Sequence, residues 1–554
     1  MIERAELSRR KFVAGTATVI AAPALIAATR GSTGNATVVE TRQGRLRGLQ
    51  GDGVLAFKGI AYAADTSGTN RFMGPLPPAN WSGVRDAFAY GDRCPQARRE
   101  SGGPFAEPAN AQQPHYSENC CVLNVYTPRI DHHRRPVMVY IHGGGYSSGS
   151  GDAPSVEGSN LARFGDVVVV TVNHRLNIFG YANLSYLGPE FADSGNVGQL
   201  DLAAALGWVR DNIEAFGGDP ARVTIFGESG GGAKIVALAL MPEASGLYRN
   251  TINMSGSGAF HLLPPGATER VSDELLKVLA LPKADARKLQ QIGAEQLYAA
   301  HVKALANLKA DQARPVIDGR HIAVEALSAR GIMLQSAVPG IMSCTATEAT
   351  PWLLSNRSNL QISAENLLAR VKAQYRIEEP KAREVIAAYQ ASGAGQSPWD
   401  LLVSIASDAL MRVPMQQVTE MRAKAGAQPV YLADFAWRSS IEGGIWGGPH
   451  AVDVPFAFGN LAASRYAAGG GQTALDASRN LMRAYVAFAT HGQPMDSSLP
   501  TWAPYDQASR VSMVIDARAD IAHDRFAERR QLCDQLNPQS TWDVTNGPLV
   551  HGIS

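Results

Sequence analysis

Runs of apolar residues alternate with helical patterns through the middle of the chain, and this alternation predicts the architecture. Residues 137–141 and 167–172 are unbroken apolar runs rich in β-branched side chains, which is typical of parallel strands covered on both faces. Residues 199–213 repeat apolar positions at helical spacing, and a further strand and helix are predicted at 223–226 and 233–240. Alternation of this kind predicts an α/β fold with a mostly parallel central sheet flanked by helices.

The segments on either side of this core follow other patterns. Residues 37–62 alternate polar and apolar positions with glycine punctuation, which predicts an entry hairpin or meander. Residues 268–310 and 360–425 are mainly helical in pattern, and we expect them to form a largely helical lid or side layer over the sheet. A late strand is predicted at 430–433, so residues 37–554 are interpreted as one domain.

The first 36 residues are predicted to be a signal peptide. Arg9 and Arg10 form a twin-arginine pattern, and a weakly apolar, alanine-rich stretch follows them. A membrane anchor or a tail outside the fold is the alternative. No later stretch approaches the roughly 20 apolar residues of a membrane span. We therefore expect export to the periplasm or secretion, with no stable membrane insertion after signal cleavage.

The composition limits which partners and cofactors the protein is expected to have. The chain has 554 residues, of which 45% are hydrophobic and 18% charged, and this balance excludes a disordered protein. Its 51 basic and 50 acidic residues leave a net charge of +1, so no nucleic-acid partner is predicted. The five cysteines and twelve histidines lack metal-ligand spacing, so neither a metal nor a cofactor is expected. The oligomeric state is left open.

A candidate nucleophile lies between a predicted strand and a predicted helix. Residues 227–231 read Gly-Glu-Ser-Gly-Gly and fit the G-x-S-x-G pattern around Ser229. A serine on a sharp strand-to-helix turn needs small neighbours, and the following helix N-terminus favours developing negative charge. The bare pattern is also compatible with a glycine-rich turn of no chemical meaning, but the strand–turn–helix context favours a nucleophile.

A glycine-rich loop precedes the nucleophile in the chain. Residues 142–145 read His-Gly-Gly-Gly and directly follow the predicted strand 137–141. Glycine lets backbone N–H groups approach a developing oxyanion without a Cβ in the way. The alternative is a phosphate-binding loop, but the residues that follow lack the G-x-G-x-x-G pattern of a dinucleotide site. The order of the two motifs is that of a serine esterase.

At this point the chain resembles the type-B carboxylesterases, which are relatives of the cholinesterases and have the α/β-hydrolase fold. The resemblance covers most of residues 37–554. Its motifs are Phe57–Ala63 (family FxGIPYA), Arg71-Phe72, Trp81, Cys94–Gln96 (CPQ), Glu118–Val125 (EDCLxLNV), Asn173–Leu176 (NYRLG), Phe216–Pro220, and Trp502 with Pro504 and Tyr505 (WPxY).

The resemblance implies two structural pairs. It implies a disulfide between Cys94 and Cys120 that closes a surface loop, and an ion pair between Arg71 and Glu118 near its base. Reduced, buried thiols are the alternative for the two cysteines. Whether the other three cysteines are free is left open; these are Cys121, Cys344 and Cys533.

The resemblance also implies the rest of a catalytic triad. Residues 448–459 are similar to the family's HGxEIxFVFG, which makes His450 the general base and acid. Glu348 occupies the place of the family's glutamate and would orient the imidazole, although Ala349 stands where the family has glycine. Ser255 falls where the family has a serine that supports this acid. The order Ser229, Glu348, His450 is that of the α/β-hydrolases.

The same resemblance implies the oxyanion donors and the chemistry. The backbone N–H groups of Gly144, Gly145 and Gly230 would form the oxyanion hole; position 230 is alanine in many relatives. Glu228, beside the nucleophile, would tune the charge of the site. A carboxylic ester hydrolase acting on small-molecule esters through an acyl-enzyme is therefore expected. The alternatives are a non-catalytic cholinesterase-like binding protein, and an amidase or acyltransferase that uses the same triad. Which ester is cleaved is not predicted.

Overall fold

The fold is described from a computed structural model that covers residues 36–97, 114–256, 262–310, 313–467, 469–536 and 549. Nearly all of the predicted signal peptide, residues 1–35, lies outside the described residues. Across the described segments, the structure contains no helix with the length and apolar character needed to span a membrane.

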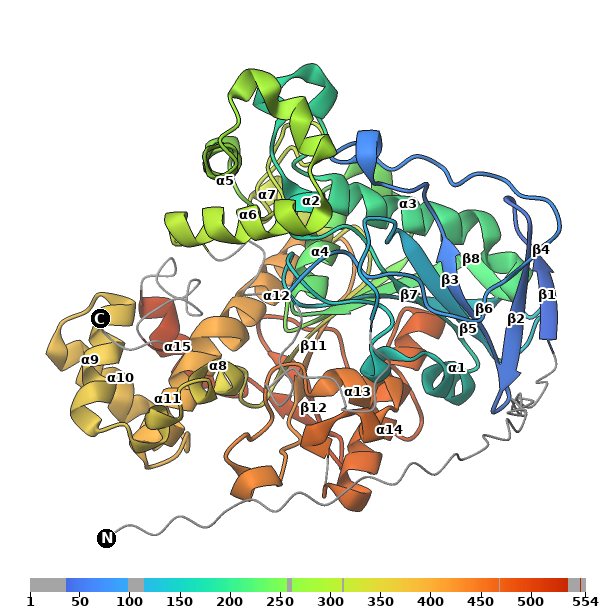
Figure 1. The fold of residues 1–554 in the computed structure, drawn as a ribbon. Helices are drawn as coiled ribbons and strands as arrows, with labels where there is room; N and C mark the ends of the chain where they lie inside the picture. Colours follow the sequence, from blue (N-terminus) through green and yellow to red (C-terminus); the bar gives the residue numbers. More distant parts are fainter. Residues whose placement is uncertain are drawn as a thin grey trace, which may run out of the picture.

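One large sheet runs through the molecule (Figure 1). In the described part of the chain it has thirteen strands in the order β1-β2-β3-β5-β7-β6-β8-β9-β10-β11-β12-β13, with β4 beside β2. Neighbouring strands from β7 to β12 are parallel, and the strand pairs toward both edges are antiparallel, except that β4 pairs with β2 in parallel. The strand bounds are Ala36–Glu40 (β1), Arg45–Gly51 (β2), Val54–Ala61 (β3), Val84–Asp86 (β4), Val122–Thr127 (β5), Arg135–Ile141 (β6), Val168–Val172 (β7), Gly218–Glu228 (β8), Asn250–Met254 (β9), Gly340–Thr345 (β10), Val430–Phe435 (β11), Val511–Ile515 (β12) and Asp520–His523 (β13).

Helices cover both faces of the parallel strands, because alternate residues of each strand point to opposite faces. Val139 and Ile141 of β6 pack in one apolar core with α3 and α4, whereas Met138 and Tyr140 pack in a second core with α13 and α14. The helix bounds are Ser159–Gly165 (α1), Asn177–Tyr181 (α2), Val197–Asn212 (α3), Gly230–Ala239 (α4), Pro265–Val278 (α5), Ala294–Leu308 (α6), Ala329–Gln335 (α7), Thr350–Leu354 (α8), Ala364–Tyr375 (α9), Glu379–Ala391 (α10), Pro398–Ser407 (α11), Val413–Ala425 (α12), Asp453–Phe458 (α13), Gly471–His491 (α14) and Ala527–Gln535 (α15). The predicted α/β-hydrolase architecture is confirmed.

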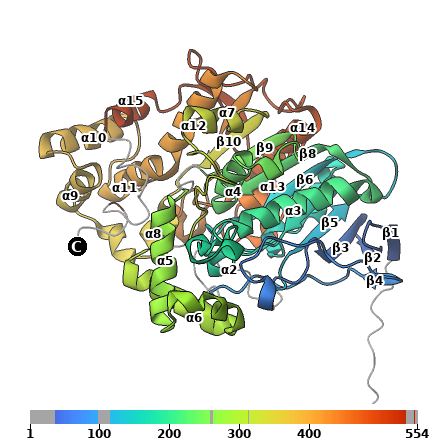
Figure 2. The ribbon, with the colours of Figure 1, turned by 90° about the horizontal axis from the view of Figure 1, so that it is seen from above.

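The two regions with helical patterns form side layers, as predicted. Helices α9, α10 and α11 lie far from the β1–β4 edge in both views and have an apolar core of their own (Figures 1 and 2). Helices α5 and α6 pack together with α2 in another separate core. A single π-helical turn, Asp408–Arg412, joins α11 to α12. Such turns are rare and are often found at functional sites.

The expected disulfide is not formed in the structure. Cys94 and Cys120 are free, buried thiols, as are the other three cysteines. The Cys94 sulfur accepts a hydrogen bond from Leu176 N at 3.2 Å. The hydrogen bond with Cys121 lowers the pKa of the Cys120 thiol, but the hydrogen bond with Cys94 and burial together raise it well above its usual value, so the thiol stays protonated. The expected ion pair is present: Arg71 Nε and Nη2 donate to the two Glu118 oxygens at 2.6 and 2.5 Å.

Candidate active site

The candidate catalytic residues follow the carboxyl ends of neighbouring parallel strands. Strand β8 ends directly before Ser229, and β6 ends directly before the loop that contains Gly144 and Gly145. Strand β10 ends at Thr345, three residues before Glu348. His450 follows β11 on a longer loop. In open α/β sheets this edge is where ligands bind.

The turn at Ser229 is sharp and depends on its glycine neighbours. Ser229 has φ 55° and ψ −121°, which is a strained conformation for a non-glycine residue. Its N–H donates to Met254 O at 2.8 Å. A Cβ added to Gly231 would lie 2.0 Å from Ile141 O, and one added to Gly227 would lie 2.6 Å from the same atom. Side chains at these positions would push β8 and α4 away from β6, and Ser229 would lose its place.

The loop after β6 supplies unused backbone donors beside the nucleophile. Gly144 and Gly145 have φ of 87° and 59°, which favours glycine. Among the described residues, neither of their N–H groups has a hydrogen-bond acceptor. A Cβ on the neighbouring Gly143 would lie 3.3 Å from Ser229 Cβ. The loop therefore holds two free amide donors near the serine.

Gly230 allows this loop to approach the nucleophile turn closely. A Cβ added to Gly230 would lie 2.3 Å from Gly145 O and 2.5 Å from Gly145 N. Both distances are too short for any side chain without movement of the loop. Alanine at position 230, which is common in relatives, therefore does not fit this arrangement of Gly145.

Glu348 is fully buried and is held by three hydrogen bonds. Ser255 Oγ and Thr345 N both donate to Glu348 Oε1 at 2.6 Å, and His450 Nδ1 lies 2.6 Å from Oε2. Burial opposes ionisation, but the charge of His450 and these hydrogen bonds together lower the pKa of Glu348. The carboxylate is therefore ionised, and the supporting contact expected of Ser255 is present.

Ala349 does not disturb the turn that carries Glu348. Its φ of −75° and ψ of −10° are ordinary for alanine, so the glycine of relatives is not needed here. Ser407 Oγ of α11 accepts a hydrogen bond from Ala349 N at 3.0 Å. On the other side of Glu348, Arg412 Nη2 donates to Thr345 O and Ala346 O at 3.1 and 3.0 Å. The segment around the π-helical turn thus clamps both ends of this loop.

Pairing of two loops brings His450 to Glu348. Thr347 N donates to Gly448 O at 2.8 Å, and Thr347 forms an isolated parallel bridge with Pro449. The indole of Trp352 lies against the imidazole, with 4.9 Å between ring centroids. His450 is 3% exposed. These contacts fix the imidazole plane with Nδ1 toward Glu348.

A second carboxylate faces the other side of the imidazole. Glu228 Oε1 lies 3.1 Å from His450 Nε2. Because Ser229 directly follows Glu228, the candidate nucleophile and the imidazole share one neighbourhood. Burial alone would lower the pKa of His450, but the charges of Glu228 and Glu348 raise it to about 9. The site therefore favours the imidazolium more strongly than an ordinary histidine environment does.

Two further ionisable residues near the site were not identified from the sequence. Both carboxylate oxygens of buried Asp453 lack hydrogen-bond partners among the described residues. Its burial, with the charges of Glu228 and Glu348, raises its pKa well above the usual range. Lys234 Nζ donates to His142 O at 2.9 Å, and burial lowers the pKa of Lys234 to about 7. Only burial distinguishes these residues from ordinary surface charges, and a sequence does not reveal it.

Within the described segments, the structure has no group of three or more His, Cys, Asp or Glu side chains placed to hold a metal ion. The chemistry that the arrangement supports is that of a serine, an imidazole and a buried carboxylate beside free amide donors.

Comparison with known proteins agrees with this arrangement. Residues 35–533 match the model of the carboxylesterase family. The chain is 33% identical over 500 residues to the para-nitrobenzyl esterase of Bacillus subtilis, an alignment covering 89% of this chain and 98% of that enzyme. The chain belongs to the carboxylesterase family. Membership makes it a carboxylic ester hydrolase of the serine hydrolase class, and the non-catalytic alternative is set aside.

Other relatives are also similar to this chain over most of its length. Phenmedipham hydrolase of Pseudarthrobacter oxydans is 31% identical, with 88% of this chain and 97% of that enzyme aligned. The crystal structure of the Geobacillus stearothermophilus carboxylesterase superposes with a TM-score of 0.76 at 33% identity, covering 90% of this chain and 99% of that chain. A Clostridium hathewayi esterase described as hydrolysing aliphatic aromatic polyesters superposes with a TM-score of 0.77 at 32% identity, covering 91% and 99%.

Proposed function

We propose that this carboxylesterase cleaves small-molecule esters through an acyl-enzyme on Ser229, with His450 as general base and acid and Glu348 as orienting acid. The observation that carries the proposal is the 2.6 Å contact between His450 Nδ1 and the buried Glu348 carboxylate. A carboxylate so placed selects the imidazole tautomer that lacks a proton on Nε2 and can accept one there, and it stabilises the imidazolium.

In the acylation step, Ser229 Oγ attacks the ester carbonyl carbon while His450 Nε2 takes the hydroxyl proton. The carbonyl oxygen becomes an oxyanion, which the N–H groups of Gly144, Gly145 and Gly230 stabilise. As the tetrahedral intermediate collapses, the bond to the alkoxy group breaks and the imidazolium returns the proton to the leaving alcohol. Water then repeats the sequence on the acyl-enzyme and releases the acid.

Glu228 adds a second stabilising charge to the imidazolium. Its carboxylate lies 3.1 Å from Nε2, on the side that receives the proton. This stabilisation has a cost, because a raised pKa of His450 leaves less neutral imidazole near pH 7. An ordinary histidine acting as the base would give half-maximal activity near pH 6–7. The raised pKa of His450 should therefore shift this half-maximal point to higher pH.

A covalent label tests the nucleophile. A fluorophosphonate or sulfonyl fluoride should modify Ser229 alone, as read by peptide mapping, and the Ser229→Ala variant should neither react nor hydrolyse esters. Label on another residue, with activity lost, would contradict the assignment. A panel of p-nitrophenyl esters from acetate to palmitate, with matching anilides, then ranks acyl length and separates ester from amide cleavage.

We also propose that the protein is exported through its twin-arginine segment. Support comes from Arg9 and Arg10 and the apolar stretch after them. Replacement of both by lysine should retain full-length protein inside the cell, as judged by fractionation and immunoblotting. Unchanged appearance of processed protein outside the cytoplasm would contradict this proposal.

A further inference from the structure

A polar cavity lies behind the turn that carries Glu348. Its volume is about 230 Å³. It is bounded by Ala346, by the connection between α10 and α11, by the π-helical turn, by the end of β11 and by the start of α15. By the usual volume of a bound water, the space holds several water molecules or a small organic anion. Neither Ser229 nor His450 lines it, so it is separate from the ester site.

Positive charge dominates the lining. Four arginines line the cavity, and the two carboxylates that face them are Asp408 and Asp434. The arginines are Arg412, Arg438, Arg525 and Arg529. With all six groups ionised, four positive and two negative charges leave a local excess of two positive charges.

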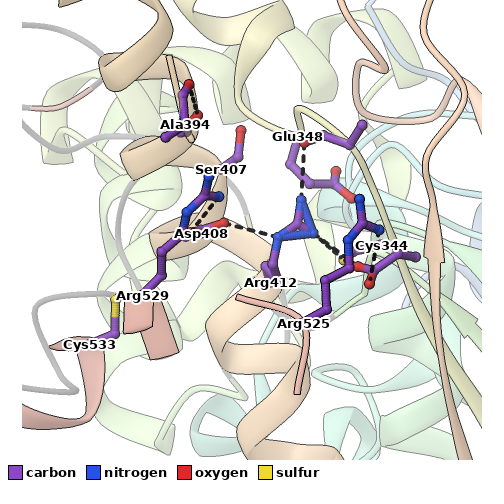
Figure 3. Close-up of polar contacts among 12 residues, drawn as sticks. Cys344, Glu348, Ala394, Ser407, Asp408, Arg412, Arg525, Arg529 and Cys533 are labelled. Atoms are coloured by element: carbon purple, nitrogen blue, oxygen red, sulfur yellow. Dashed lines mark hydrogen bonds and ion pairs between the residues drawn. The ribbon is translucent and has the colours of Figure 1, made fainter. Parts of the chain in front are cut away.

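Each of the two carboxylates already contacts two of the arginines. Asp408 contacts Arg412 Nε at 3.0 Å and Arg529 Nη1 at 3.5 Å. Asp434 contacts Arg412 Nη1 at 3.2 Å and Arg525 Nη1 at 3.4 Å. Figure 3 shows Arg412 between Asp408 and Cys344, with Arg525 and Arg529 on either side. Arg412 is thus saturated, whereas Arg525 and Arg529 retain guanidinium N–H groups without acceptors in the described residues.

Arg438 forms no ion pair with a carboxylate among the described residues. Among the described residues it makes no hydrogen bond or ion pair, although it lines the same cavity. Desolvation, and then the charges of Arg412 and Arg525, lower its pKa. The charges of Asp400 and Asp516 oppose this effect, so the charge of Arg438 is compensated only in part.

An aromatic ring keeps the guanidinium groups together despite this repulsion. The Arg412, Arg525 and Arg529 guanidinium carbons lie 4.9, 4.6 and 4.6 Å from the centroid of Phe526. Cation–π attraction at these distances offsets part of the mutual repulsion. The result is a preformed cluster of cations around a partly open, wettable space.

We propose that this cavity binds a small oxyanion, carried by a carboxylate or a phosphate, through Arg438, Arg525 and Arg529. Planar guanidinium groups match the geometry of these anions and bind them with two parallel hydrogen bonds. An anion here would neutralise the excess charge without displacing Asp408 or Asp434. The proposal does not depend on the catalytic assignment of Ser229.

The test uses the full-length protein and two probes, inorganic phosphate and acetate, at constant ionic strength against chloride. Thermal melting and equilibrium dialysis should show a saturable rise in melting temperature and one bound anion. The probe that saturates at lower concentration identifies the anion class. Chloride that raises the melting temperature equally, or no saturable binding of either probe, would overturn the proposal.

Three variants locate the binding. Arg438→Gln should weaken anion binding about tenfold or more, because a charge-assisted contact is lost. Arg438 has no hydrogen-bond or ion-pair partner in the described part of the chain, so the variant should fold and keep its esterase activity. Arg249→Gln removes the same charge from an exposed position outside the cavity, and it should bind as the wild type does. Equal binding by wild type and Arg438→Gln, confirmed with Arg525→Gln, would overturn the assignment.

Discussion

The two halves of the proposed active site are held in place by different forces. On the acid half, Glu348 and His450 are positioned by short hydrogen bonds and opposite charges within a buried loop pair. On the nucleophile half, Ser229 and the loop with Gly145 are positioned by backbone packing that only glycine permits. The acid half should therefore respond to changes of charge at constant shape, and the nucleophile half to changes of volume at constant charge.

The largest effect is expected from a change of charge on the acid half. Glu348→Gln keeps the shape but places an amide where His450 Nδ1–H and the Ser255 and Thr345 donors need a carboxylate. We expect kcat for p-nitrophenyl butyrate to fall about 10³–10⁴-fold. Circular dichroism and thermal melting report whether the fold is kept. A folded variant with kcat within tenfold of wild type would contradict the role of Glu348.

A change of volume on the nucleophile half should come next. Gly230→Ala adds one methyl group that must push Gly145 away, because its Cβ would lie 2.3 Å from Gly145 O. Displacing one oxyanion donor should lower kcat about 10²–10³-fold with a smaller change in KM. Gly207→Ala is the matched control, since no atom lies within 4 Å of a Cβ there. If Gly230→Ala keeps the wild-type kcat, the close approach of the loop is not needed for catalysis.

A third prediction tests the carboxylate of Glu228, which directly precedes Ser229 and lies beside His450. In wild type, the raised pKa of His450 means that activity rises as pH increases and neutral imidazole forms. Glu228→Gln removes the largest of the charges that raise this pKa. The half-maximal point of the kcat–pH profile should then move to lower pH by about one unit or more.

The control for Glu228→Gln is Glu325→Gln, which removes a carboxylate at an exposed position and should leave the kcat–pH profile unchanged. A Glu228→Gln profile that overlays wild type, or moves to higher pH, would show that Glu228 does not act on the imidazole.

The smallest effect is expected from the outermost hydrogen bond of the acid half. Ser255→Ala removes one of the two donors to Glu348 Oε1 but leaves Thr345 N and His450 in place. We expect kcat to fall about tenfold, the cost of one lost hydrogen bond to a buried charge. Ser255→Thr retains the hydroxyl and should recover part of the rate. An effect as large as that of Glu348→Gln would mean that Ser255 has a further role.

How well the sequence predicts a structural feature depends on which interactions hold that feature in place. The sequence predicts β6, β7 and the turn at Ser229 directly. The two strands are recognisable as apolar runs, and the turn is recognisable from the small residues around the serine. Strand β9 was not predicted, since its buried Asn250 and Asn253 resemble a polar loop. The long helix α14 was also missed, because alanine and polar residues obscure its apolar face.

The acid half shows the same division. Glu348 and His450 are 102 positions apart, so their pairing was predicted only through family resemblance. The roles of Arg412, Asp453 and Lys234 depend on burial and on contacts between distant segments, which no local pattern reports. The doubt that Ala349 raised about the turn was resolved only by its backbone angles.

The bridge between Thr347 and Pro449 has a consequence for biosynthesis. A ribosome releases the nucleophile turn long before the segment that carries the base, and β11 must be added to β10 before the two loops meet. On the proposed assignment, a nascent or C-terminally truncated chain therefore has Ser229 without its proton acceptor. Ester hydrolysis can then begin only after the segment with His450 has been synthesised and β11 has paired with β10.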